Sequence, residues 1–114
     1  MLVSLERGMA IVDRIRTSGR FGLSLLAEDQ LPLALRVWRG AASPAALDRD
    51  RLVRDGDDPP VLERGVGHFV CEVAGEFNAD ADCVGFHGPV VRFGWGRRAA
   101  AQLRADQLTA AERG

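Results

Sequence analysis

Four residues that can bind a metal lie close together in the sequence: His68, Cys71, Cys83 and His87. Zinc prefers imidazole and thiolate ligands in a tetrahedral site, so the set suggests a metal-binding hairpin. The residues around His68 alternate between apolar and polar, as in a strand, and residues three apart on a strand point to opposite faces. A chelating pair needs converging side chains. We therefore expect no metal site, with Cys71 in the core and His68 facing solvent.

Other catalytic arrangements have weaker support. A serine, a histidine and an aspartate for a triad are present, but no strained nucleophile elbow surrounds Ser24. Gly94-Trp95-Gly96 lacks the third glycine that opens a helix in a dinucleotide fingerprint. A Cys71–Cys83 disulfide across the hairpin fits the geometry, but a reducing compartment favours free thiols. We assign no catalytic residue from these patterns.

A strand followed by a turn and a helix is the local feature best suited to a ligand. Residues 21–26 have the length and composition of a buried strand, with the small polar Ser24 among large apolar residues. The helix that follows opens at residues 27–30, where free backbone N–H groups favour an anion. Such a site suits a flat, hydrogen-bonding ligand that carries a phosphate. The alternative, that Ser24 faces solvent or bonds its own backbone, stays open.

The first half of the chain predicts alternating short elements. Residues 2–5 read as the tail of a strand, and residues 9–17 as a helix that ends at a left-handed Gly19. In the helix after the strand 21–26, Asp29 is the expected N-cap and Pro32 lies in the first turn. The predicted buried face of this second helix contains Leu31, Leu35 and Trp38, flanked by Leu33 and Val37. Gly40 is expected to end the helix.

The second half predicts a hairpin and a helix. Residues 41–58 are the loosest stretch, with a short helical turn at 45–53 and a solvent-facing turn at 55–60. Residues 66–77 and 84–95 read as two paired strands, the second interrupted at Gly88-Pro89, where we expect a bulge or an edge. Residues 98–113 favour a helix. The fold class is therefore mainly β with helices.

Composition limits the function classes. The 114 residues are 46% hydrophobic, enough for one domain with a core. The net charge of −1 argues against a general nucleic-acid or membrane-surface binder, and no apolar run is long enough to span a membrane. The start shows no signal-peptide pattern, so we expect a cytoplasmic protein.

The segment Ser18-Gly19-Arg20-Phe21-Gly22-Leu23-Ser24-Leu25-Leu26-Ala27-Glu28-Asp29-Gln30 resembles the flavin reductase-like family of FMN-binding split barrels. Family members typically show a helix, then G-x-F-x-V-N-x-L, then a helix that opens near Glu-Asp-Gln. Further similar segments follow in the family's order: Leu35-Arg36-Val37-Trp38, Pro60-Val61-Leu62-Glu63, His68-Phe69-Val70-Cys71-Glu72-Val73, Ala81-Asp82-Cys83 and Phe86-His87-Gly88-Pro89-Val90-Val91. With residues 2–7 as the end of a family strand, the resemblance covers roughly residues 2–95.

The resemblance implies a partial, antiparallel FMN-binding split β-barrel, usually a homodimer, with a C-terminal helix. It implies non-covalent FMN or FAD, with hydride transfer from NAD(P)H to the flavin and supply of reduced flavin to a partner monooxygenase. By position, Ser24 replaces a family asparagine near the flavin ring. The implied neighbours of the ring and its tail are Leu26, Ala27 and Gln30, and those of the phosphate are Arg7 and Gly8.

The sequence also departs from the family pattern at both ends. The early strands and a Ser/Thr-rich flavin-contacting segment have no counterpart, so we expect a domain over residues 1–96 that is short at the N-terminus. Residues 97–114 form a helical tail where the family has a last strand. The alternative function is a shortened, non-catalytic dimeric binding or assembly module, with this tail contacting a partner.

Overall fold

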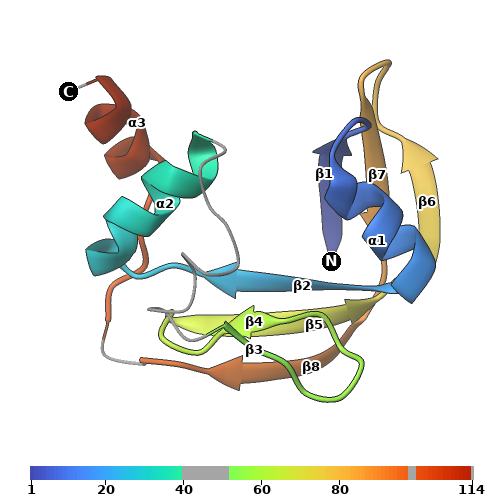
Figure 1. Ribbon diagram of the computed structural model, residues 1–114, viewed down its shortest axis with the longest axis horizontal. Coiled ribbons are helices and arrows are strands. Elements are labelled where there is room, and N and C mark those ends of the chain that lie inside the picture. The colour runs from blue at the N-terminus through green and yellow to red at the C-terminus, as the bar shows by residue number, and fades with distance from the viewer. Residues whose placement is uncertain (40–51, 98–99, 114) are drawn as a thin grey trace.

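A long hairpin, bent in its middle, contributes to both main sheets (Figure 1). Near one end, β5 (Gly67–Glu72) pairs antiparallel with β8 (Val90–Trp95). Beyond the bend, β6 (Gly75–Asn78) pairs antiparallel with β7 (Cys83–His87). The computed structural model describes residues 1–39, 52–97 and 100–113. The predicted hairpin and the interruption of its second strand at Gly88-Pro89 are confirmed, whereas the prediction of one unbroken strand over residues 66–77 is wrong.

The bend has a local cause on each arm of the hairpin. Gly88 lies so close to the Glu72 carbonyl that a Cβ at this position would overlap it. Pro89 follows without an N–H to donate to a ladder. The pairing of β5 with β8 shifts between Val70 and Cys71, which confirms an irregularity in this part of the hairpin. The bend thus directs the two halves of the hairpin into different sheets.

The remaining strands complete the sheets. β1 (Leu2–Glu6) adds to β7 and gives the order β1-β7-β6. β2 (Arg20–Leu25) adds to β5 and gives the order β2-β5-β8. β3 (Leu52–Val53) and β4 (Val61–Leu62) form a separate antiparallel pair beside β2. Residues 52–53 are therefore strand and not the predicted helical turn, while residues 45–51 and Gly40 lie outside the described residues.

Three α-helices accompany the sheets in the described residues. α1 (Ala10–Ser18) ends at Gly19, whose φ of 72° confirms the left-handed cap. A 3₁₀ turn, η1 (Glu28–Gln30), leads into α2 (Leu31–Trp38), with Pro32 in the first turn of α2 as expected. α3 (Ala105–Arg113) is shorter than predicted, because residues 100–104 run alongside η1 instead of continuing a helix.

Two predictions about the second helix are wrong. Asp29 is not an N-cap, because the helical turn already begins at Glu28 and the Asp29 carboxylate binds the Arg97 guanidinium at 2.6 and 2.7 Å. The buried residues of α2 are Leu33 and Ala34, whereas Trp38 is 67% exposed. The helix therefore turns a different face to the protein from the one that we expected.

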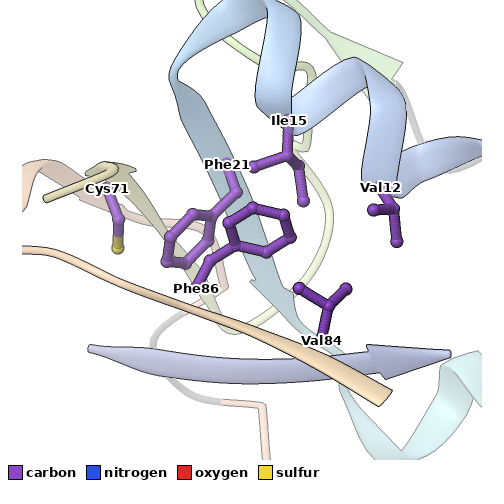
Figure 2. Close-up of a cluster of buried hydrophobic side chains, with 6 residues drawn as sticks. All are labelled: Val12, Ile15, Phe21, Cys71, Val84 and Phe86. Atoms are coloured by element: carbon purple, nitrogen blue, oxygen red, sulfur yellow. The ribbon is translucent and has the colours of Figure 1, made fainter. Parts of the chain in front are cut away.

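The core lies where α1 and the two main sheets meet. Its buried side chains point toward one another from α1, β2, β5 and β7 (Figure 2): Val12, Ile15, Phe21, Cys71, Val84 and Phe86. Cys71 is fully buried among them, as predicted. Burial of this apolar surface holds the two sheets together, because they share no continuous hydrogen-bond ladder.

The turn before β4 is confirmed, but one of its residues is not solvent-facing. The Asp58 N–H donates to the Asp55 carbonyl, and Gly56 has a positive φ of 59°. The Asp58 carboxylate, only 13% exposed, lies 2.5 Å from an Arg20 nitrogen and 2.6 Å from an Arg92 nitrogen. These ion pairs fix the turn to β2 and β8.

None of the described helices has the length and apolar content needed to cross a membrane.

Candidate functional site

A cavity of about 880 Å³ lies between β1, the end of β2 and the helices α2 and α3. Its volume is in the range of pockets that hold cofactors. Apolar side chains dominate its walls, and two serines and one glutamate add polar groups. The lining residues are Ser4, Leu5, Glu6, Met9, Ser24, Leu26, Leu33, Ala34, Val37, Trp38, Leu62 and Leu108. Such walls suit a large, flat ligand with a few hydrogen-bonding atoms.

Ser24 is the polar group best placed on the β2 wall. It lies on β2 opposite His68, and its Oγ accepts a hydrogen bond from the Leu62 N–H at 3.0 Å. A hydroxyl has one proton to donate besides its acceptor sites. Ser24 can therefore donate to a ligand while its acceptor bond to β4 fixes its orientation. The Ser24 hydroxyl thus bonds the backbone of β4. This contact differs from both alternatives, in which Ser24 faces solvent or bonds its own backbone.

The other predicted residues of this segment divide into two groups. Leu26 lines the cavity, with Ser24. Ala27 and Gln30 are 1% and 5% exposed and are absent from the cavity wall. The Gln30 Oε1 accepts a hydrogen bond from the Ala27 N–H at 2.9 Å, so the pair shapes the turn into α2. Their contact with a flavin stays a prediction.

Arg7 and Gly8 lie between two lining residues, Glu6 and Met9, but neither lines the cavity. The Arg7 guanidinium instead reaches the turn between β6 and β7. There it donates to Asn78 Oδ1 at 2.6 Å and to the carbonyls of residues 80, 81 and 83 at 3.3–3.4 Å. Arg7 thus closes this turn in the structure, and its predicted contact with a phosphate stays a prediction.

Sequence reasoning missed the contributions of β1 and of the two outer helices. Ser4 and Glu6 share one face of β1, and their period-two spacing was the available signal. Val37 and Trp38 are 54% and 67% exposed on α2, next to Leu108 of α3 in the lining. Both residues were predicted to lie on or beside the buried face of this helix. The pattern thus indicated that they contact apolar surface, but it did not show that they line an open cavity.

Neither cysteine provides an activated thiol. Burial raises the pKa of the Cys71 thiol, and partial desolvation, with Asp80 as a further cause, raises the pKa of the Cys83 thiol. A thiol with a raised pKa stays protonated at neutral pH and is a poor nucleophile. Both cysteines are free. Their chemistry therefore does not suggest covalent catalysis.

The four residues of the metal hypothesis are spread over the sheets. Among the described residues, no group of three or more histidine, cysteine or acidic side chains is arranged to hold a metal. His68 is half-buried and not solvent-facing as predicted, because its ring lies over Gly94 on β8. The His87 ring lies beside Phe77, with the ring centroids 6.2 Å apart.

A second cavity, of about 520 Å³, lies between α1, the start of β2 and the turn before β4. Apolar residues form its floor, including Ile15, Phe21 and Pro60. Arginine and aspartate side chains balance each other around it. The mixed charges of this wall do not indicate a particular ligand.

A known protein-family model matches almost the whole chain. The model of the flavin reductase like domain matches residues 1–109. The chain belongs to this family. An NADH-dependent flavin reductase from Rhodococcus is 38% identical over 74 residues, which are 64% of this chain and 39% of that relative. The chain thus spans about two fifths of the length of the curated relative that it matches.

Solved structures show the same fold. BorF, the flavin reductase component of a bacterial two-component tryptophan halogenase, has a TM-score of 0.69 at 23% identity, over 90% of this chain and 72% of its own. A complex of the Streptomyces globisporus NADH:FAD oxidoreductase SgcE6 with NAD and FAD fragments has a TM-score of 0.71 at 20% identity, over 89% and 59%. The Thermus thermophilus FMN-binding protein has a TM-score of 0.68 at 20% identity, over 86% and 54%.

These similarities confirm the predicted fold class of a split β-barrel with a C-terminal helix. In the described residues the sheets do not close into a full barrel, since they remain as two three-stranded sheets and one strand pair. The open arrangement agrees with the predicted partial barrel. Helices α2 and α3 lie across from β1 in the fold (Figure 1), and residues of all three elements line the cavity.

Proposed function

We propose that this member of the flavin reductase family binds a flavin without a covalent bond in the 880 Å³ cavity and transfers hydride to it from NAD(P)H. One observation supports the proposal most strongly: a cavity of cofactor size combines apolar walls with the oriented hydroxyl of Ser24. The proposed cofactor is FMN or FAD. The family match and the NADH-dependent relative support the redox role.

The chain's own residues fit the chemistry of an isoalloxazine ring. The ring has an apolar edge, which Leu33, Val37 and Leu62 can cover, and a hydrogen-bonding edge, which Ser24 can reach. Trp38 offers an exposed aromatic face on the same wall. When bound, a flavin accepts hydride itself, so the protein's task is to bind it, orient it and exclude water.

We propose further that the tail, residues 97–114, completes this wall for the domain of residues 1–96. The Leu103 N–H donates to the Leu26 carbonyl, and the Glu28 N–H donates to the Ala101 carbonyl. Leu108 of α3 then lies in the cavity lining. These contacts support a tail that works with the domain at the flavin site.

We propose a cytoplasmic homodimer that supplies reduced flavin to a monooxygenase. Two free cysteines support a reducing compartment. β8 is an edge strand with Val91, Phe93 and Trp95 exposed, and an exposed apolar edge favours pairing with another chain. BorF, a structural relative, is the reductase component of a two-component system.

A non-catalytic dimeric module is the second candidate, and the same exposed edge of β8 favours it. Titration of the purified chain with FMN or FAD, followed by flavin fluorescence, tests binding. NADH or NADPH oxidation with added flavin then separates the two candidates. We expect saturable flavin binding at one site per chain and flavin-dependent oxidation above the protein-free background. Binding without oxidation would support the module, and the absence of any flavin binding would contradict the proposal.

A further inference from the structure

The charge of the cavity differs from what a phosphate-bearing ligand requires. Among the described lining residues, Glu6 has the only ionisable side chain, and no arginine reaches the wall. The described part of the chain provides no ion pair for Glu6. Within the described part of the chain, the Glu6 carboxylate therefore has no ion-pair partner at the edge of this apolar cavity.

The nearest cation in the sequence is already engaged. Arg7 follows Glu6 directly, but its guanidinium binds Asn78 and three backbone carbonyls of the turn between β6 and β7. Turning Arg7 toward the cavity would break these bonds and leave the turn without its donor. Arg7 lies in the turn after β1, and its guanidinium is held at the turn between β6 and β7, away from the cavity wall.

A flavin phosphate would meet repulsion here. A phosphate monoester has a charge of about −1.5 to −2 at neutral pH, because its second pKa is near 6. Like charges repel more strongly next to apolar walls than in bulk water, since the effective dielectric constant is lower. The sugar-alcohol chain of a flavin, by contrast, has hydroxyl groups that can donate to a carboxylate.

We propose that Glu6 makes this site select the uncharged part of the flavin, its ring and ribityl chain, and disfavour the phosphate. The inference rests on the proposed function, because it concerns the same cavity. In this arrangement Ser24, on β2, donates a hydrogen bond to the flavin ring. Glu6, on β1, accepts hydrogen bonds from the hydroxyls of the ribityl chain. It follows that riboflavin binds at least as tightly as FMN.

The test compares dissociation constants for riboflavin and FMN, measured by fluorescence at low and high salt. For the wild type we expect equal or tighter binding of riboflavin, and FMN binding that improves with salt as repulsion is screened. Glu6→Gln should tighten FMN binding about five-fold while riboflavin binding stays equal or weakens. Glu6→Lys should tighten FMN further. Asp57→Asn removes an exposed carboxylate outside this cavity and should change neither constant.

The possible failures are distinguishable. If the wild type binds FMN more tightly than riboflavin, or if Glu6→Gln leaves the ratio of the two constants unchanged, the inference is overturned while flavin binding stands. If neither flavin binds to the folded wild type, the proposed function fails and the inference fails with it. Circular dichroism of each variant verifies that the comparison is made on folded protein.

Discussion

Ser24 provides the sharpest test of the site, because its hydroxyl has both a structural and a proposed binding role. Ser24→Ala removes the acceptor for the Leu62 N–H, a half-buried bond of 3.0 Å. Loss of one such bond costs about 0.5–1.5 kcal/mol of unfolding free energy. Loss of one hydrogen bond to the flavin weakens binding by a similar free energy, or about 2- to 10-fold.

Two further substitutions separate the hydrogen bonding of Ser24 from the cavity volume that a larger side chain would fill. Ser24→Asn keeps an acceptor for Leu62 and adds amide donors, so flavin binding should equal or exceed that of the wild type. Ser24→Phe places a ring in the cavity, and flavin binding should be lost while the far-ultraviolet circular dichroism stays native. Ser18→Ala is the matched control, since among the described residues the Ser18 hydroxyl bonds the Arg20 backbone, at the surface.

The assay is a flavin titration followed by fluorescence, beside urea unfolding of the same samples. The expected order of flavin affinity is Asn at least equal to Ser, then Ala, with Phe unable to bind. If Ser24→Phe binds flavin as tightly as the wild type and folds, the flavin does not lie against β2. The assignment of the cavity would then be wrong, whatever the affinity of the wild type.

Three other predictions concern stability and reactivity. Phe86→Ala removes a 1% exposed ring from the core and should lower the unfolding free energy by about 3–5 kcal/mol in urea titrations, and a loss under 1 kcal/mol would show that the core is misassigned. Hydrogen bonds from Arg97 lower the pKa of Asp29, so this pair stabilises the fold above the ordinary aspartate pKa, near 4. That contribution disappears as pH falls through the lowered value, so Asp29→Asn should reduce the thermal midpoint at pH 7 but not in strong acid. Iodoacetamide should modify the half-buried Cys83 before the fully buried Cys71, as read by mass spectrometry, and the reverse order would contradict the placement of these thiols.

Local signals in the sequence were sufficient for the first elements of the fold. The apolar spacing of α1 and the left-handed Gly19 need no distant contact, and both were predicted. The bend between Glu72 and Gly75 was missed, because Val73 and Ala74 carry no turn signal. Only the partner arm, with Gly88 against the Glu72 carbonyl, shows where the hairpin changes sheets.

The buried face of α2 could not be predicted for a different reason. Its sequence is apolar on most sides, so periodicity does not single out one face. Packing places Leu33 and Ala34 inside and leaves Trp38 exposed beside the cavity.

For the site, the strand-turn-helix pattern singled out Ser24, and the family resemblance added Leu26. Glu6 was missed because the period-two spacing of β1 shows only that Ser4 and Glu6 share a face, and not that this face meets the same cavity as β2. That juxtaposition depends on the bend of the hairpin, which brings the two main sheets together. Arg7 was assigned to a phosphate by position alone, and only the structure shows its contacts with the β6–β7 turn.

A crystal structure of the chain grown with saturating riboflavin tests the central claim most directly. We expect electron density for the ring in the cavity, within hydrogen-bond distance of the Ser24 hydroxyl and in contact with Leu62 and Trp38. Density for the ring at another surface, or an empty cavity under these conditions, would contradict the assignment of the flavin site.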